Sequence, residues 1–139
     1  MELAKKVVNK MINGDAFSQW LGIEILEVNK GYCKLKMIIR KEMTNGFDIA
    51  HGGISYSLAD SALAFAANSY GIQSLSIETS ISHTKKVLNG DTLIAETKEI
   101  SKDEKSAVYN IHITNQNNID IAHFQGKVYR TNKEWFSNR

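Results

Sequence analysis

The stretch HGGISYSLADSALAFAANSYG, residues 51–71, decides the architecture of this 139-residue chain. Between residues 50 and 70 the only formally charged side chain is Asp60. Alanine, leucine and phenylalanine dominate the rest, and two glycines follow a histidine at the start. We expect a long, buried α-helix over about residues 52–69 with one carboxylate in its middle. Because a lone carboxylate is costly to bury without a partner, Asp60 requires an explanation.

The flanking segments show helix and strand patterns. Before the long helix, apolar side chains at every fourth position predict an amphipathic helix over residues 2–12, and Asp15 can cap a brief second helix. Residues 22–28 and 32–40 are typical of two strands joined by a hairpin turn at residues 29–31. Beyond the helix, polar turns separate four strand-like segments that we expect to form a meander: residues 74–84, 92–101, 106–114 and 119–130.

This order of elements predicts an α+β fold. A single helix cannot cover both faces of a sheet of six strands, whereas a twisted antiparallel sheet curled around the helix would bury it on almost all sides. The alanines of residues 59–67 would allow the sheet to approach closely. The predicted architecture is an antiparallel sheet of about six strands wrapped around one long central helix, with short N-terminal helices.

Length and composition restrict the function. A chain of this length without proline fits one domain, residues 1–139. The formal charge of +2 does not favour nucleic acid as a partner. No window resembles a secretory signal or a membrane span, so we expect a cytoplasmic protein without a membrane partner. Cys33 is the only cysteine and the four histidines lack metal-ligand spacing, so we expect neither a disulfide nor a metal.

The start of the helix and its carboxylate both suggest chemistry. Gly52 and Gly53 lie where the helix begins, and we expect their N–H groups to be unpaired at the positive end of the helix dipole. Such a position stabilises a developing oxyanion and lets a substrate carbonyl come close, although two glycines can also simply form a tight turn. A desolvated Asp60 would have a raised pKa and could activate water or attack a carbonyl itself. Alternatively, Asp60 lies on the one solvent-exposed face of the helix or pairs with a distant lysine, and has no role in catalysis.

The spacing of these residues along the helix has a geometric consequence. Asp60 follows Gly52 by eight residues, which is about 12 Å at a rise of about 1.5 Å per residue. One substrate carbonyl cannot contact both residues within a single subunit. If both act on it, Asp60 must come from a second chain whose helix runs antiparallel, as in a two-fold dimer with its sites between the subunits.

A set of residues around the helix resembles the signature of hotdog-fold thioesterases, and within them the phenylacetic acid degradation (phenylacetyl-CoA) branch. The separations of six residues from Asn to His and nine from His to Asp match that family. The resemblance extends in weaker form over about residues 15–130. The residues that carry it are Asn45-Gly46, His51-Gly52-Gly53, Leu58-Ala59-Asp60, Ala62 and Asn68-Ser69.

The resemblance implies roles for further residues, each of which also has an ordinary reading as a turn, cap or strand residue. Asn45 would donate its side-chain amide to the thioester carbonyl, and His51 would hold Asn45 or its loop in place. Ser76 would help to orient water. His83 and the turn at residues 101–106 would contact the coenzyme A nucleotide, with lysines near its phosphates. The residues of this last group are His83, Ser101, Lys102, Lys105 and Ser106, together with Lys85 and Lys86.

The favoured function is an acyl-CoA thioesterase that acts on a small or medium acyl group, with an aryl group as one option. It would need no cofactor, because coenzyme A is part of the substrate. The resemblance also implies at least a homodimer, and a homotetramer built as a dimer of dimers. Two alternatives stay open: a hotdog hydratase or dehydratase, and a non-catalytic acyl-CoA-binding or regulatory protein. Four aromatic residues could line an acyl pocket or belong to the core: Phe47, Tyr56, Phe65 and Tyr70.

Overall fold

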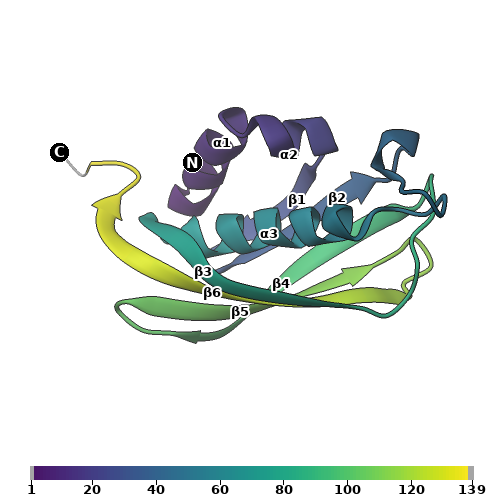
Figure 1. Ribbon diagram of the computed structural model, residues 1–139. Helices are drawn as coiled ribbons and strands as arrows, with labels where there is room; N and C mark the ends of the chain where they lie inside the picture. Colours follow the sequence, from purple (N-terminus) through teal and green to yellow (C-terminus); the bar gives the residue numbers. More distant parts are fainter. Residues whose placement is uncertain (1, 138–139) are drawn as a thin grey trace.

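The computed structural model describes residues 2–137, in which one sheet lies against a long helix (Figure 1). The long helix α3 spans Gly52–Asn68, and the shorter helices α1 (Leu3–Asn13) and α2 (Ala16–Leu21) lie on its side away from the sheet. A 3-10 helix at Lys41–Met43 precedes the loop into α3. The strands are β1 (Glu24–Asn29), β2 (Tyr32–Ile38), β3 (Ile72–His83), β4 (Thr92–Lys102), β5 (Ser106–Thr114) and β6 (Asp120–Glu134). The predicted α+β hotdog fold is confirmed.

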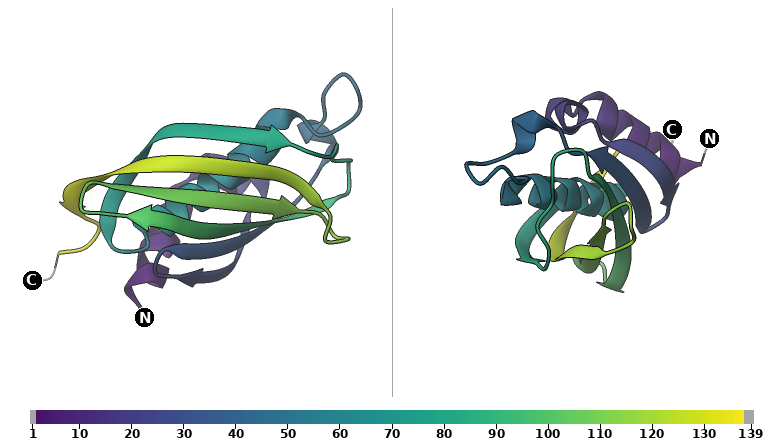
Figure 2. Two further views of the ribbon diagram at one scale, coloured as in Figure 1. Left: turned by 90° about the horizontal axis from the view of Figure 1, so that it is seen from below. Right: turned by 90° about the vertical axis from the view of Figure 1, so that its right-hand side faces the viewer.

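The order of the strands corrects one expectation. The sheet is antiparallel throughout, in the order β1-β2-β4-β5-β6-β3. The expected meander of four strands is wrong, because only β4, β5 and β6 follow one another in the sheet. β3 pairs with β6 instead, from Ile72↔Glu134 to His83↔Ala122, and forms the edge opposite β1 (Figure 2). The helix α3 separates β2 from β3 in the chain and leads to the far edge, a placement that strand patterns alone do not encode.

The core lies between α3 and the concave face of the sheet. Leu58, Ala59 and Ala62 of α3 are fully buried there, and the end view shows the sheet curling around the helix (Figure 2). Gly126 of β6 permits a close approach, because a Cβ at this position would lie 2.5 Å from Leu63 Cδ2. This packing fixes the middle of α3, and with it Asp60, against β6 and β3.

One stripe of α3 remains partly accessible. Gly53, Ser57, Asp60 and Ala64 recur at intervals of three or four residues, and none of them is fully buried. The burial of the helix is therefore incomplete on the side that carries its carboxylate. No helix within residues 2–137 is both long and apolar enough to cross a membrane.

Candidate active site

The start of α3 has one amide available to a ligand. His51 caps the helix: its Nδ1 accepts a hydrogen bond from the N–H of Gly53 at 2.8 Å, and its carbonyl oxygen accepts one from Ile54 at 2.9 Å. The expectation that both glycine amides are unpaired is therefore wrong for Gly53. The N–H of Gly52 has no hydrogen-bond partner within the described part of the chain. Gly52 is thus the helix-start donor that could bind an oxyanion.

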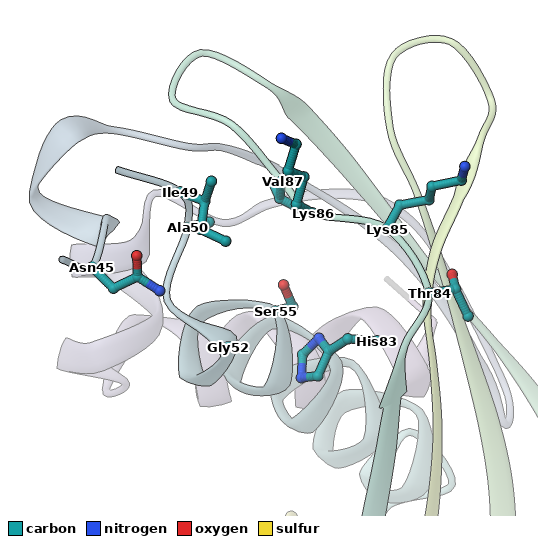
Figure 3. Close-up of a pocket in the computed structure, with 10 residues that line it drawn as sticks. All are labelled: Asn45, Ile49, Ala50, Gly52, Ser55, His83, Thr84, Lys85, Lys86 and Val87. Carbon is teal, nitrogen blue, oxygen red and sulfur yellow. The ribbon is translucent and has the colours of Figure 1, made fainter. Parts of the chain in front are cut away.

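Asn45 precedes the helix with its amide group in a fixed orientation. Its Oδ1 accepts a hydrogen bond from the N–H of Phe47 at 2.9 Å, which assigns the other amide position to the NH2 group. That nitrogen points into the pocket beside Gly52 (Figure 3). Within residues 2–137 no hydrogen bond joins the side chains of His51 and Asn45. His51 contacts the loop through its backbone instead, since its N–H donates to the Met43 carbonyl oxygen at 2.8 Å.

Asn45 and Gly52 border a pocket of about 300 Å³ at the start of α3 (Figure 3). His83, at the end of β3, closes one side of it: its Nε2 lies 3.4 Å from the place that a Cβ on Gly52 would occupy. Lys85 and Lys86 belong to the rim, and their amino groups point away from the pocket (Figure 3). The structure thus brings together three residues that were predicted from separate parts of the sequence, namely Asn45, Gly52 and His83.

Asp60 lies in a second pocket, of about 320 Å³. Its carboxylate is half-buried, and it forms no ion pair or hydrogen bond with any other residue in the range 2–137. Burial raises the pKa of this carboxyl above its usual value of 3.8. Ser76 of the edge strand β3 lines the same pocket, so the structure brings these two predicted residues together. Most of the other walls are apolar: Met11, Leu63, Ala64, Leu75, Val128 and Trp135.

Sequence reasoning missed Trp135, which forms one wall of the Asp60 pocket. Its indole N–H donates to Asn68 Oδ1 at 2.8 Å, and its backbone N–H donates to the Gly71 carbonyl oxygen at 2.9 Å. Asn68 Oδ1 also accepts the N–H of Ser74 at 2.8 Å. The indole is therefore held against the end of α3 from 67 residues away in the chain. A tryptophan beyond the last predicted strand carries no local sign of this contact.

The predicted contacts to the coenzyme A nucleotide fall at two ends of the subunit. His83 lies at the start of α3, whereas Lys102 Nζ lies 4.6 Å from the Tyr70 ring, just beyond the end of that helix. In the turn itself, the N–H groups of Lys105 and Ser106 donate to Asp103 Oδ1 at 2.9 and 2.8 Å. Ser101 and Lys102 end β4 and line neither pocket. One subunit does not bring His83 and this turn together.

None of the four aromatic residues considered for an acyl pocket lines the Asp60 pocket. Phe65 is core, with 1% of its surface exposed, and Phe47 is 85% exposed. The Tyr56 hydroxyl is hydrogen-bonded to Thr79 Oγ1, and the Tyr70 hydroxyl donates to Glu99. The tryptophan that lines the pocket was not among the candidates.

A hotdog fold with an unpaired helix-start amide and an unpaired carboxylate on the same helix is the arrangement expected of a thioester hydrolase. The chain belongs to the thioesterase superfamily, whose family model matches residues 47–122. It is similar to a proposed esterase of Archaeoglobus fulgidus, with 39% identity over 96% of this chain and 87% of that one. It is also similar to the acyl-coenzyme A thioesterase PaaI of Escherichia coli, with 35% identity over 86% of each chain. The solved structure of the E. coli PaaI protein superimposes with a TM-score of 0.92 at 33% identity, over 94% of this chain and 95% of that one.

Proposed function

We propose that the protein hydrolyses acyl-CoA thioesters of small or medium acyl groups, with Asp60 of one subunit and Gly52 of another acting on the same carbonyl. The observation that carries this proposal is Asp60 itself. It is a half-buried carboxylate with a raised pKa and no partner within residues 2–137, in a pocket with mainly apolar walls. The similarity to E. coli PaaI, named an acyl-coenzyme A thioesterase, supports acyl-CoA as the substrate class.

The proposed reaction uses donors and base that face each other across two chains. Asp60 takes a proton from a water molecule, and the resulting hydroxide attacks the thioester carbon. The carbonyl oxygen becomes an oxyanion that accepts hydrogen bonds from the Gly52 N–H and the Asn45 amide. Collapse of this intermediate breaks the carbon–sulfur bond, and the coenzyme A thiolate leaves and takes up a proton. In a variant of this route Asp60 attacks the carbon itself, the carbon–sulfur bond breaks as the coenzyme A thiolate leaves, and water then hydrolyses the mixed anhydride to the free acid and Asp60. Ser76 is suited to orient the water, because it lines the Asp60 pocket.

A second copy of the chain has a suitable place to bind. β3 is an edge strand of twelve residues, and it exposes 66% of Leu75 and 59% of Ile77. A long edge strand with exposed apolar side chains and free backbone groups favours pairing with another strand. A two-fold dimer formed along β3 would set one subunit's Asp60 pocket, which Leu75 and Ser76 line, beside its partner. We extend the proposal to a homotetramer built from two such dimers.

The two pockets suggest which part of the substrate each one binds. The Asp60 pocket, about 320 Å³, lies at the small end of the roughly 300–1,000 Å³ range of ligand pockets, which favours short, medium or compact aryl acyl groups over long chains. The Gly52 pocket has Lys85 and Lys86 on its rim. Their charges suit the phosphates of coenzyme A.

The direct test is thiol release from a panel of acyl-CoAs with short, medium, long and aryl acyl groups. We expect the highest kcat/KM among the short, medium or aryl substrates and a lower value for the long chains. The same acyl groups on a thiol without the nucleotide should show a higher KM, because the lysine contacts are lost. Absence of thiol release from every acyl-CoA by folded protein would overturn the proposal.

A further inference from the structure

Three potential metal ligands lie together on the outer face of the sheet, on the opposite side from α3. His112 of β5 and His123 of β6 are direct cross-strand partners, and their rings stack with centroids 4.7 Å apart. Asp120 Oδ1 lies 2.7 Å from His112 Nε2, and its Oδ2 lies 4.0 Å from His123 Nε2. All three side chains are about half exposed. Both imidazoles therefore direct the same nitrogen toward one carboxylate.

A bulge in β6 creates this arrangement. In a regular strand, residues three apart point to opposite faces, so Asp120 and His123 would be separated by the sheet. The register shifts here, because Ile113 pairs with Ala122 whereas Thr114 pairs with Asp120. Ile121 and Ala122 are both fully buried, so two successive residues face the core. The extra residue returns Asp120 to the outer face beside His123.

We propose that His112, His123 and Asp120 form a binding site for a divalent transition-metal ion of the Zn²⁺, Ni²⁺ or Cu²⁺ type. Two imidazoles and one carboxylate suit these borderline ions better than Mg²⁺ or Ca²⁺, which prefer oxygen ligands alone. Three protein ligands and a water molecule would complete a tetrahedral Zn²⁺ site.

The geometry is close to what such an ion requires. One ligand atom from each residue lies within 4.8 Å of the others. Two ligands of a tetrahedral Zn²⁺ ion with bonds of about 2.0 Å are about 3.3 Å apart. Binding would therefore lengthen the His112–Asp120 contact and shorten the His123–Asp120 contact, which half-exposed side chains can do by small rotations. No metal signal is visible in the sequence, because the ligands are adjacent only through the strand register and the bulge.

The ion would join β5 to β6 beside the turn that connects them. Because the site is formed only in the folded chain, binding would raise thermal stability by mass action. It lies on the other side of the sheet from both pockets of the thioesterase site, so it would act on stability and not on the hydrolytic reaction.

The test is calorimetric titration of untagged protein with ZnCl₂, NiCl₂ and MgCl₂, together with thermal unfolding in each salt. We expect saturable binding of Zn²⁺ and Ni²⁺ with one ion per chain and a raised Tm, and neither effect with Mg²⁺. The variants His112→Gln and His123→Gln should each weaken Zn²⁺ binding by about tenfold or more, since each removes an imidazole ligand.

Two controls separate this site from other sources of binding. The variant Asn110→Ala alters an exposed polar side chain on the same strand and should bind Zn²⁺ as the wild type does. The double variant His51→Gln/His83→Gln leaves His112 and His123 as the only histidines of the chain and should also retain the ion. The proposal would be overturned if the wild type did not bind Zn²⁺. It would also be overturned if Zn²⁺ binding survived His112→Gln but was lost in the double variant.

Discussion

Gly52 and Asp60 belong to the same helix, yet they line different pockets of the subunit. Eight residues of helix separate them by about 12 Å along its axis. The available amide of Gly52 and the unpaired carboxylate of Asp60 therefore cannot reach one carbonyl within a single chain. In the proposed site each subunit would supply two half-sites, and a partner with an antiparallel helix would complete both.

The first prediction concerns Asp60→Asn. The substitution keeps the shape of the side chain and removes its charge and basicity, so the dimer should form as before. Turnover should fall by about 10²–10⁴, the range expected for a general base. Steady-state thiol release, with circular dichroism to verify folding, measures this. Ser57→Ala changes a neighbour on the same accessible stripe and should keep the wild-type rate. Normal turnover by the folded Asp60→Asn variant would remove Asp60 from the mechanism.

The second prediction follows from the raised pKa of Asp60. Below its usual value of 3.8, the carboxyl is protonated in both the folded and the unfolded chain, so the wild type and the Asp60→Asn variant should have similar stability. Above the raised pKa of the folded state, the wild type must keep a desolvated charge. Asp60→Asn should therefore increase the free energy of unfolding at neutral pH, and the gain should vanish as the pH falls through the raised pKa.

Urea unfolding across this pH range measures the difference. An Asp60→Asn variant that is less stable than the wild type at neutral pH would mean that the carboxylate has a favourable partner in the folded protein. In the same pH window, kcat/KM of the wild type should decline toward acid, because the base becomes protonated.

The third prediction concerns Asn45→Asp. An aspartate can still accept the Phe47 N–H that fixes the loop, but it replaces the amide donor with an oxygen. Loss of one oxyanion donor typically lowers kcat by about 10²–10³, and we expect at least this effect. Thermal stability should change little. If the variant folds and keeps its kcat, the oxyanion does not bind at Asn45.

The fourth prediction concerns Trp135, the wall of the Asp60 pocket. Trp135→Ala should enlarge the pocket and raise the kcat/KM of longer acyl-CoAs relative to shorter ones by about tenfold, as for pockets that discriminate by methylene groups. Trp135→Phe loses the hydrogen bond to Asn68 but keeps most of the bulk, so it should retain the wild-type preference. Unchanged ratios in the alanine variant would show that the acyl group does not reach Trp135.

The fold was largely predictable because its main signals are local. The buried helix, its start at Gly52 and the hairpin of β1 and β2 follow from hydrophobic patterns, glycines and turn residues. The position of β3 was not predictable in this way, because its partner β6 lies about 40 residues further along the chain. Strand patterns indicate which segments form strands, but not which strands are neighbours in the sheet.

The candidate site likewise has features that the local sequence predicts and features that depend on contacts formed on folding. Asp60 could be found as the one charge in an apolar helix, and Gly52 from its place at the helix start. The binding of Gly53 by His51, the amide orientation of Asn45 and the wall formed by Trp135 depend on side chains that meet only after folding. The cluster of His112, Asp120 and His123 depends on a β-bulge that the sequence pattern does not predict.

The central claim is that Gly52 and Asp60 serve one substrate from two chains, and mixing two inactive variants tests it most directly. At Gly52 even a Cβ would lie 3.4 Å from His83 Nε2, so the branched side chain of Gly52→Val should block the approach of the carbonyl. Asp60→Asn removes the base. Neither variant alone should be active.

In a mixed dimer of the two, one site would carry both substitutions and the other neither. Random subunit exchange makes half of the dimers mixed, with one intact site of two in each, so activity should return to about a quarter of the wild-type value. Native mass spectrometry of the same sample measures the fraction of mixed dimers. A mixture with that fraction confirmed and no recovered activity would contradict a site shared between Gly52 and Asp60 of different chains.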